Sequence, residues 1–145
     1  MSHFNQIYSQ KLTAAPILEQ LNKQKWLFIF EKAFGITEFQ SLSLQSAQEL
    51  ISDIAEKMTS KNFLHQIDTI SKLFTIESSL THKRQAILKI LLPLHMSVME
   101  KHGFGGEIGY VRAQRAIMDH YHDPLISQTA SNAQLVVFKR AKLID

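Results

Sequence analysis

Four of the five glycines in this chain lie within seven residues, at positions 103, 105, 106 and 109. Apolar side chains recur at intervals of three and four residues on both sides of this stretch, which is the spacing of amphipathic helices. The glycines therefore separate two groups of expected helices. From this pattern we predict an all-α fold, a single compact bundle of five to six helices.

Start and stop residues divide the part of the chain before these glycines into four helical segments. Pro16 suits the first turn of a helix, and Gly35 suits a left-handed stop at the end of the same helix. Ser43 is a favourable cap for the next segment, because its hydroxyl can accept a hydrogen bond from a free backbone N–H. The expected helices cover residues 16–34, 44–58, 61–76 and 82–102.

The fourth of these segments is the most apolar. Its Ile, Leu, Val and Met side chains cover more than one face, which predicts a central helix that is contacted on several sides. Pro93 lies inside it and lacks the backbone N–H that a helix interior requires. We expect the helix to kink near residues 89–93 or to divide into two helices there.

The segment after the glycines predicts two more helices. The fifth ends at His122, and Asp123 followed by Pro124 is typical of the cap and first turn of a sixth. Residues 135–138 have strand propensity, so an early end of the sixth helix is an alternative. Its expected buried residues are Leu125, Ile126, Thr129, Ala133, Val136 and Val137, with Phe138 as a further candidate.

Three regions follow from this division of the chain. Residues 1–14 lack a helical period and are expected to form an extended N-terminal tail, followed by one helical domain over 15–140. A short basic C-terminal tail covers 139–145. The N-terminal tail carries spaced apolar side chains that suit anchoring to this protein or to a neighbour: Phe4, Ile7, Tyr8 and Leu12.

Composition limits the class of protein. With 145 residues and 45% apolar residues, the chain is large enough for one domain with its own core. It contains no cysteine, which excludes disulfides, thiolate metal sites and cysteine nucleophiles. No apolar run reaches the roughly 18 residues of a membrane span, and no secretory signal pattern is present. We expect an intracellular protein in a reducing compartment, the cytoplasm, with the mitochondrion as the alternative.

The glycine stretch does not match a nucleotide-binding motif. A phosphate-binding loop requires Gly-Lys-Ser/Thr at its end, and a dinucleotide fingerprint requires a glycine where Ile108 stands. No nucleophile elbow is present elsewhere. We expect a helix stop at Gly103, followed by a tight turn in which Phe104 enters the core. On these grounds the chain is predicted not to be an enzyme.

The histidines do not form a recognisable metal motif. On one helix, His120 and His122 would point about 200° apart, and Asp123 is expected to cap the next helix. His95 and His102 can share a helix face, but no third ligand completes a site at a useful spacing. We therefore predict no metal ion and no cofactor, and a partly buried, hydrogen-bonded His95.

Basic residues in the last third of the chain are the main candidates for a charged partner. The net charge is only +3, so composition favours nucleic acid weakly. The residues expected to form one basic surface are Arg112, Arg115, Lys139, Arg140 and Lys142.

A series of short motifs resembles the small eukaryotic family called protein C-ten. Leu92-Pro-Leu lies in an apolar helix, His102-Gly-Phe follows, then Glu107-Ile-Gly, and finally Asp123-Pro-Leu-Ile. That family has an apolar helix with Leu-Pro, a Tyr-Gly-Phe-like turn, a glycine before the next helix and a late Asp-Pro. The match covers about residues 90–140, with a fainter similarity at Glu31-Lys-Ala-Phe.

This chain also departs from the family pattern. His102 stands where an aromatic residue is usual, the spacing from Leu-Pro to Gly-Phe is shorter, and the 60–85 region looks inserted. The resemblance implies a small, helical, non-enzymatic protein, and it transfers no catalytic residues.

Three functions are compatible with these observations. The first is a non-enzymatic structural or interaction subunit of a larger protein assembly, because catalytic motifs are absent and Phe and Met are abundant. The alternative is a small accessory subunit that binds RNA or DNA through the basic C-terminal face. The third is a bundle that binds a ligand or metal through His95, His102, His120 or His122.

Overall fold

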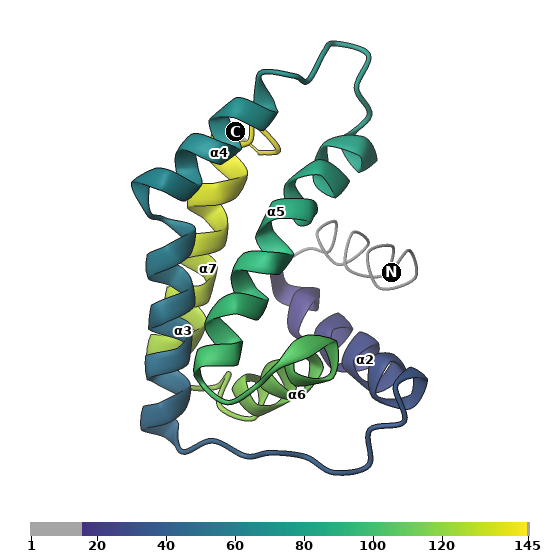
Figure 1. The fold of residues 1–145 in the computed structure, drawn as a ribbon, viewed down its shortest axis with the longest axis vertical. Helices are drawn as coiled ribbons and strands as arrows, with labels where there is room; N and C mark the ends of the chain where they lie inside the picture. Colours follow the sequence, from purple (N-terminus) through teal and green to yellow (C-terminus); the bar gives the residue numbers. More distant parts are fainter. Residues whose placement is uncertain (1–15, 145) are drawn as a thin grey trace.

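The computed structural model describes residues 16–144 and confirms the all-α prediction (Figure 1). Within these residues there are six helices and no strand. The N-terminal tail with Phe4, Ile7, Tyr8 and Leu12 lies outside the described residues. The helices are α2 (Pro16–Ala33), α3 (Leu44–Met58), α4 (Lys61–Ser71), α5 (Leu80–Lys101), α6 (Gly106–Met118) and α7 (Pro124–Arg140).

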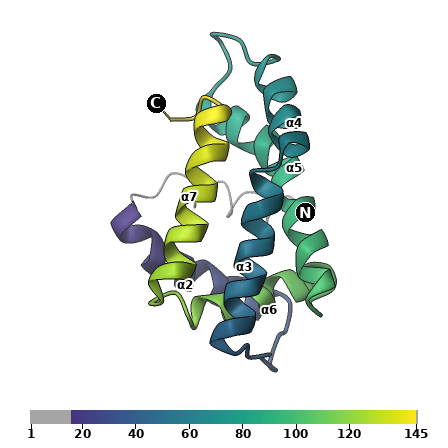
Figure 2. The same cartoon turned by 90° about the vertical axis from the view of Figure 1, so that its left-hand side faces the viewer.

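The helices form an elongated bundle with two helices across one end. In Figure 1, α3, α4 and α7 lie together on one side, and α5 runs down the other side. α6 crosses the lower end and packs against α2 (Figures 1 and 2). α5 contacts α3, α4 and α6, as expected of a central helix, and α3 shares this position because it contacts α4, α5, α6 and α7.

Side-chain caps determine where four of the helices begin. The hydroxyls of Ser43, Ser60 and Ser79 accept hydrogen bonds from backbone N–H groups in the first turns of α3, α4 and α5. The carboxylate of Asp123 does the same for α7, with Pro124 in the first turn. The predicted caps at Ser43 and Asp123 are confirmed, as is the left-handed stop at Gly35, which has a φ of +66°.

The α5 helix runs through Pro93 without interruption, so the prediction of two separate helices is excluded. Because proline has no N–H, the carbonyl of Lys89 lacks its usual helical donor four residues later. Likewise, α7 remains helical through residues 135–138, so strand propensity does not end it early.

Two predicted helix ends are wrong. α4 ends at Ser71 instead of 76, because the chain tightens there: the N–H groups of Leu73 and Phe74 donate to carbonyls three residues earlier. α6 ends at Met118 instead of His122 for the same reason, with further tightened turns after it. Helical spacing alone does not indicate where a helix changes to such turns.

Several apolar side chains expected in the core are exposed. Leu125 and Val136 in α7 are exposed, whereas Ile126, Ala133 and Val137 are buried as predicted. α7 packs on α3 and α4 along one face only, so side chains about 100° away from that face reach solvent. Large apolar residues of the other predicted helical segments are exposed too, among them Ile29, Leu44, Leu73 and Ile108.

The glycine stretch forms the turn between α5 and α6 as predicted. Gly103 has a φ of +92°, and the Phe104 side chain that follows is buried in the core. Gly109 lies one turn into α6, directly against the backbone of Phe104. A Cβ atom at this position would lie 2.4 Å from the carbonyl carbon of Phe104. The absence of a side chain here lets α6 begin close against the end of α5.

Candidate functional site

Arg115, one of the five predicted basic residues, forms an ion pair within the protein. Its guanidinium donates two hydrogen bonds to Glu31 in α2, from Nε to Oε2 at 2.9 Å and from Nη2 to Oε1 at 2.6 Å. Glu31 is only 5% exposed. The hydrogen bond to Glu31 raises the pKa of Arg115 further above its ordinary value. This pair joins α6 to α2, so Arg115 is not available as a free cation.

Arg140 is paired in the same way. Its Nε donates to Oδ1 of Asp68 at 2.7 Å and its Nη2 donates to Oδ2 at 2.8 Å, which joins the end of α7 to α4. The hydrogen bond from Arg140 lowers the pKa of Asp68 and raises the pKa of Arg140. Both groups are partly exposed to solvent.

The five basic residues do not form one surface, which corrects the prediction. Arg112 and Arg115 lie in α6 at the lower end of the bundle, whereas Lys139, Arg140 and Lys142 lie at the upper end (Figure 1). The fold separates them because α7 leads away from α6 along the length of α3. Lys139 and Lys142 are exposed, and the Nε atom of Arg112 is buried without a hydrogen-bond partner.

The polar segment around residues 119–123 supports the fold. The Nε2 atom of His120 donates to the carbonyl of Leu42 at 2.6 Å, which fastens the loop between α2 and α3 to the end of α6. Asp123 caps α7 and also accepts a hydrogen bond from Gln48 in α3 at 3.2 Å. His122 is exposed.

His95 was predicted to be partly buried, and the structure places it among the buried residues, 9% exposed. Its ring lies between α3 and α6, with Nε2 3.2 Å from the sulfur of Met58 and the ring stacked on Tyr110 at a centroid distance of 6.5 Å. These contacts join α5 to α3 and to α6 within the core.

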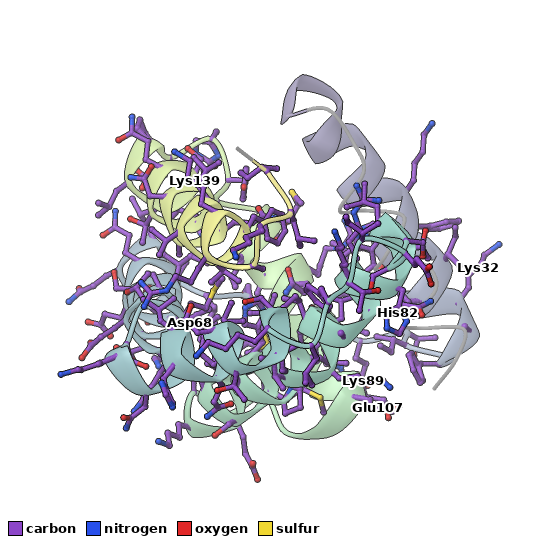
Figure 3. The ribbon with its side chains drawn as sticks, turned by 90° about the horizontal axis from the view of Figure 1, so that it is seen from above. Lys32, Asp68, His82, Lys89, Glu107 and Lys139 are labelled. Carbon is purple, nitrogen blue, oxygen red and sulfur yellow. The ribbon has the colours of Figure 1, made fainter. Side chains whose placement is uncertain are left out.

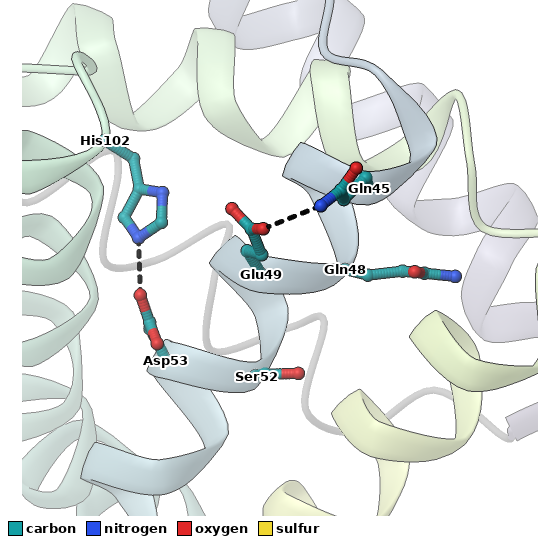
Figure 4. A pocket seen from close by; sticks show the side chains of 6 residues that line it. All are labelled: Gln45, Gln48, Glu49, Ser52, Asp53 and His102. Atoms are coloured by element: carbon teal, nitrogen blue, oxygen red, sulfur yellow. Dashed lines mark hydrogen bonds and ion pairs between the residues drawn. The ribbon is translucent and has the colours of Figure 1, made fainter.

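A shallow polar depression lies beside His102. It has a volume of about 390 Å³, and its lining residues come from α3 and from the end of α5 (Figure 4). The Nε2 atom of His102 donates to Asp53 at 2.7 Å, and Gln45 donates to Glu49 at 3.3 Å. Ser52 also lines it, and in Figure 4 its hydroxyl points away from His102. The depression therefore lacks a nucleophile activated by the histidine.

No metal centre is formed by the histidines and carboxylates of residues 16–144. No group of three or more of these side chains lies close enough together to hold an ion. His95, His102, His120 and the capping Asp123 each have a separate structural partner. The site chemistry of the described residues is thus that of hydrogen bonds and ion pairs between helices.

Two groups of exposed apolar side chains were not predicted from the sequence. Phe28 and Ile29 face solvent from α2, although the same helix buries Trp26, Leu27 and Phe30. Leu73, Ile76 and Leu80 face solvent around the loop between α4 and α5. The exposure of Ile76 could have been predicted, because it directly precedes the helix-breaking residues Glu77-Ser-Ser. A side chain in such a loop does not lie on the buried face of a helix.

Comparison with known proteins gives no relative. No protein-family model, curated protein sequence or solved structure matches this chain. Among the described residues, no helix has the length and apolar character that crossing a membrane requires.

Proposed function

We propose that this protein is a non-enzymatic interaction subunit of a larger protein assembly, and that the outer face of α2 contacts a partner protein. The observation that carries this proposal is the exposure of adjacent large apolar residues on that face. Phe28 is 56% exposed and Ile29 is 46% exposed. Trp26, Leu27 and Phe30 of the same helix are buried.

From Trp26 to Phe30, α2 is apolar on every side, and a helical segment of this kind normally lies inside a protein or an assembly. Among the helices described, α2 packs only against α6, and the side that carries Phe28 and Ile29 is exposed. Aromatic and aliphatic side chains exposed together are typical of the buried centre of a protein interface. A partner that covers Phe28 and Ile29 would complete the burial of α2.

The surroundings of Phe28 fit the rim of such an interface. The Nζ atom of Lys32 lies 5.0 Å from the centre of the Phe28 ring, a cation–π distance. The interaction keeps a charged group beside the apolar pair, as in interfaces with a polar rim. The resemblance to protein C-ten, as part of this proposal, agrees with a small helical protein without catalytic residues.

Nucleic-acid binding is less well supported as the function. Arg115 and Arg140, two of the five basic residues on which it depends, are each held by a carboxylate through two hydrogen bonds. The remaining three are divided between the two ends of the bundle.

The test is recovery of a partner with the tagged full-length chain from its own cells. We expect wild type to elute above monomer size with a reproducible set of proteins, and the double variant Phe28→Ser with Ile29→Ser to lose them. Leu135→Ser is the matched control, because Leu135 is an equally exposed aliphatic residue on α7. A wild-type monomer without co-purifying protein, or equal loss in the control, would contradict the proposal.

A further inference from the structure

The upper end of the bundle carries a projecting group of aliphatic side chains. The loop between α4 and α5, together with the first residue of α5, covers residues 72–80 and is here called the α4–α5 tip. Figure 1 shows it at one end of the longest axis, beyond the helices. Leu73 is 76% exposed, Ile76 is fully exposed, and Leu80 is also exposed. A convex tip with uncovered aliphatic side chains is unfavourable in water unless something buries it.

Unpaired cations lie on the elements that meet at this end. Seen from above, Lys139 lies on the side of α7, and His82 and Lys89 lie on the side of α5 (Figure 3). The Nζ atom of Lys83 lies 5.9 Å from the centre of the Phe74 ring, directly behind the tip. Arg140 is the exception, because Asp68 neutralises it. Among the described residues, the cations at this end that form no ion pair within 4 Å are Lys72, Lys83, Arg84, Lys89, Lys139 and Lys142. Of these, Lys72 lies near enough to Asp68 to contribute to lowering the pKa of that carboxyl.

Charge is divided between the two ends of the molecule. Residues 61–91 and 137–144, which build the upper end, contain eight Lys and Arg residues and two acids. Residues 34–58 and 92–123, which build the rest of the bundle apart from α2, contain four Lys and Arg residues and eight acids. The α2 segment, residues 16–33, adds three lysines and two acids. The small net charge of +3 conceals this division. The apolar tip thus belongs to the basic end.

We infer that the α4–α5 tip and the surrounding cations dock on an anionic membrane surface. Leu73, Ile76 and Leu80 enter the boundary between headgroups and acyl chains, and lysines and arginines beside them contact lipid phosphates. This surface is separate from Phe28 and Ile29 on α2, where the partner protein is proposed to bind, so the two contacts are independent. It requires no membrane-spanning helix.

The chemistry of the tip favours a lipid surface over nucleic acid or a protein groove. Proteins that hold single-stranded nucleic acid usually present exposed aromatic rings for stacking. At this tip the exposed apolar residues are aliphatic, and the one aromatic ring described there, that of Phe74, is partly buried beneath Lys83. A bilayer accepts a convex tip without a preformed complementary pocket, whereas a protein partner must provide one.

The test is flotation of the full-length chain with vesicles of phosphatidylcholine, with and without phosphatidylserine. Wild type is expected to float only with phosphatidylserine, and less so as salt rises, because salt screens the attraction. Ile76→Ser should weaken binding about tenfold through the lost apolar burial. Lys72→Gln combined with Lys139→Gln should weaken it by about fivefold for each charge removed.

Two matched controls lie away from the basic end. Leu125→Ser removes an exposed aliphatic residue at the start of α7, and Lys57→Gln with Lys101→Gln removes two cations beside the His102 depression. Both controls are expected to bind like wild type. The inference is overturned if wild type does not float with phosphatidylserine vesicles, or if the controls lose as much binding as the tip variants. Binding to a DNA or RNA oligonucleotide or to polyglutamate, without vesicle binding, also overturns it.

Discussion

Glu31 and Arg115 lie 84 residues apart in sequence and are joined by two hydrogen bonds between α2 and α6. The carboxylate is almost fully buried, whereas the guanidinium retains access to solvent. Among the helices described, α2 packs only against α6, and this pair is a polar connection between the two.

Arg115→Ala should lower the free energy of unfolding by about 2–3 kcal/mol, because it leaves the Glu31 carboxylate buried without its cation. The value is below that of a fully buried pair, since Arg115 reaches solvent. Chemical denaturation would measure the change. Glu31→Ala in the Arg115→Ala background should cost little more, and an additive loss would contradict a direct pair.

Asp68→Asn should destabilise the protein at neutral pH and have little effect in acid. The pKa of folded Asp68 is depressed below its ordinary 3.8 by the hydrogen bond from Arg140. The contribution of this pair is therefore present above the unfolded pKa, and it is lost as the pH falls through the lower, folded pKa. Melting temperatures of both proteins, measured from pH 7 downward, should begin to converge below about pH 4 and become equal only below the folded pKa of Asp68. A constant difference would contradict the assignment.

Gly103→Val and Gly103→Ala should destabilise the fold through backbone strain alone, with alanine costing about 1–2 kcal/mol. The nearest atom to an added Cβ is Gln40 Nε2 at 3.9 Å, so space is available, but φ is +92°. Gly103→Asn should recover part of the loss, because asparagine tolerates positive φ better than alanine. Thermal unfolding of these variants tests the conformation, and unchanged stability would refute it.

Gly109→Ala should be more damaging than Gly103→Ala, by a different mechanism. An added Cβ would lie 2.4 Å from the carbonyl carbon and 2.7 Å from the oxygen of Phe104. These are backbone atoms, so relief requires α6 to move from the end of α5, at a cost of about 3 kcal/mol or more. Gly109→Asn should give no recovery relative to alanine. An unfolding free energy equal to that of wild type would show that α6 shifts freely.

Local chemistry explains which parts of the fold were predictable from the sequence. Ser43, Asp123 with Pro124, and Gly35 act on their own neighbours, so their residue types predict the helix boundaries. The ends of α4 and α6 were predicted too late, because tightened turns continue the apolar spacing after the α-helix has ended. Ser71 and Met118 carry no residue-type signal for a helix end.

The charged surface was not predictable in the same way. Arg140 meets Asp68 across 72 residues, and no local spacing indicates that the two will pair. The sequence places Arg112 and Arg115 in the same third of the chain as Lys139, and this proximity predicted one basic surface. α7 runs from one end of the bundle to the other (Figure 1). Residues of α6 and residues at the end of α7 are therefore close in sequence but far apart in the structure.

The separation of charge along the bundle affects how the molecule is oriented before it binds a surface. Positive charge at one end of the longest axis and negative charge at the other give it a permanent electric dipole. Close to an anionic surface, within a Debye length of about 10 Å at 0.1 M salt, the field exerts a torque that turns the basic end inward. The protein would then arrive with its orientation already selected.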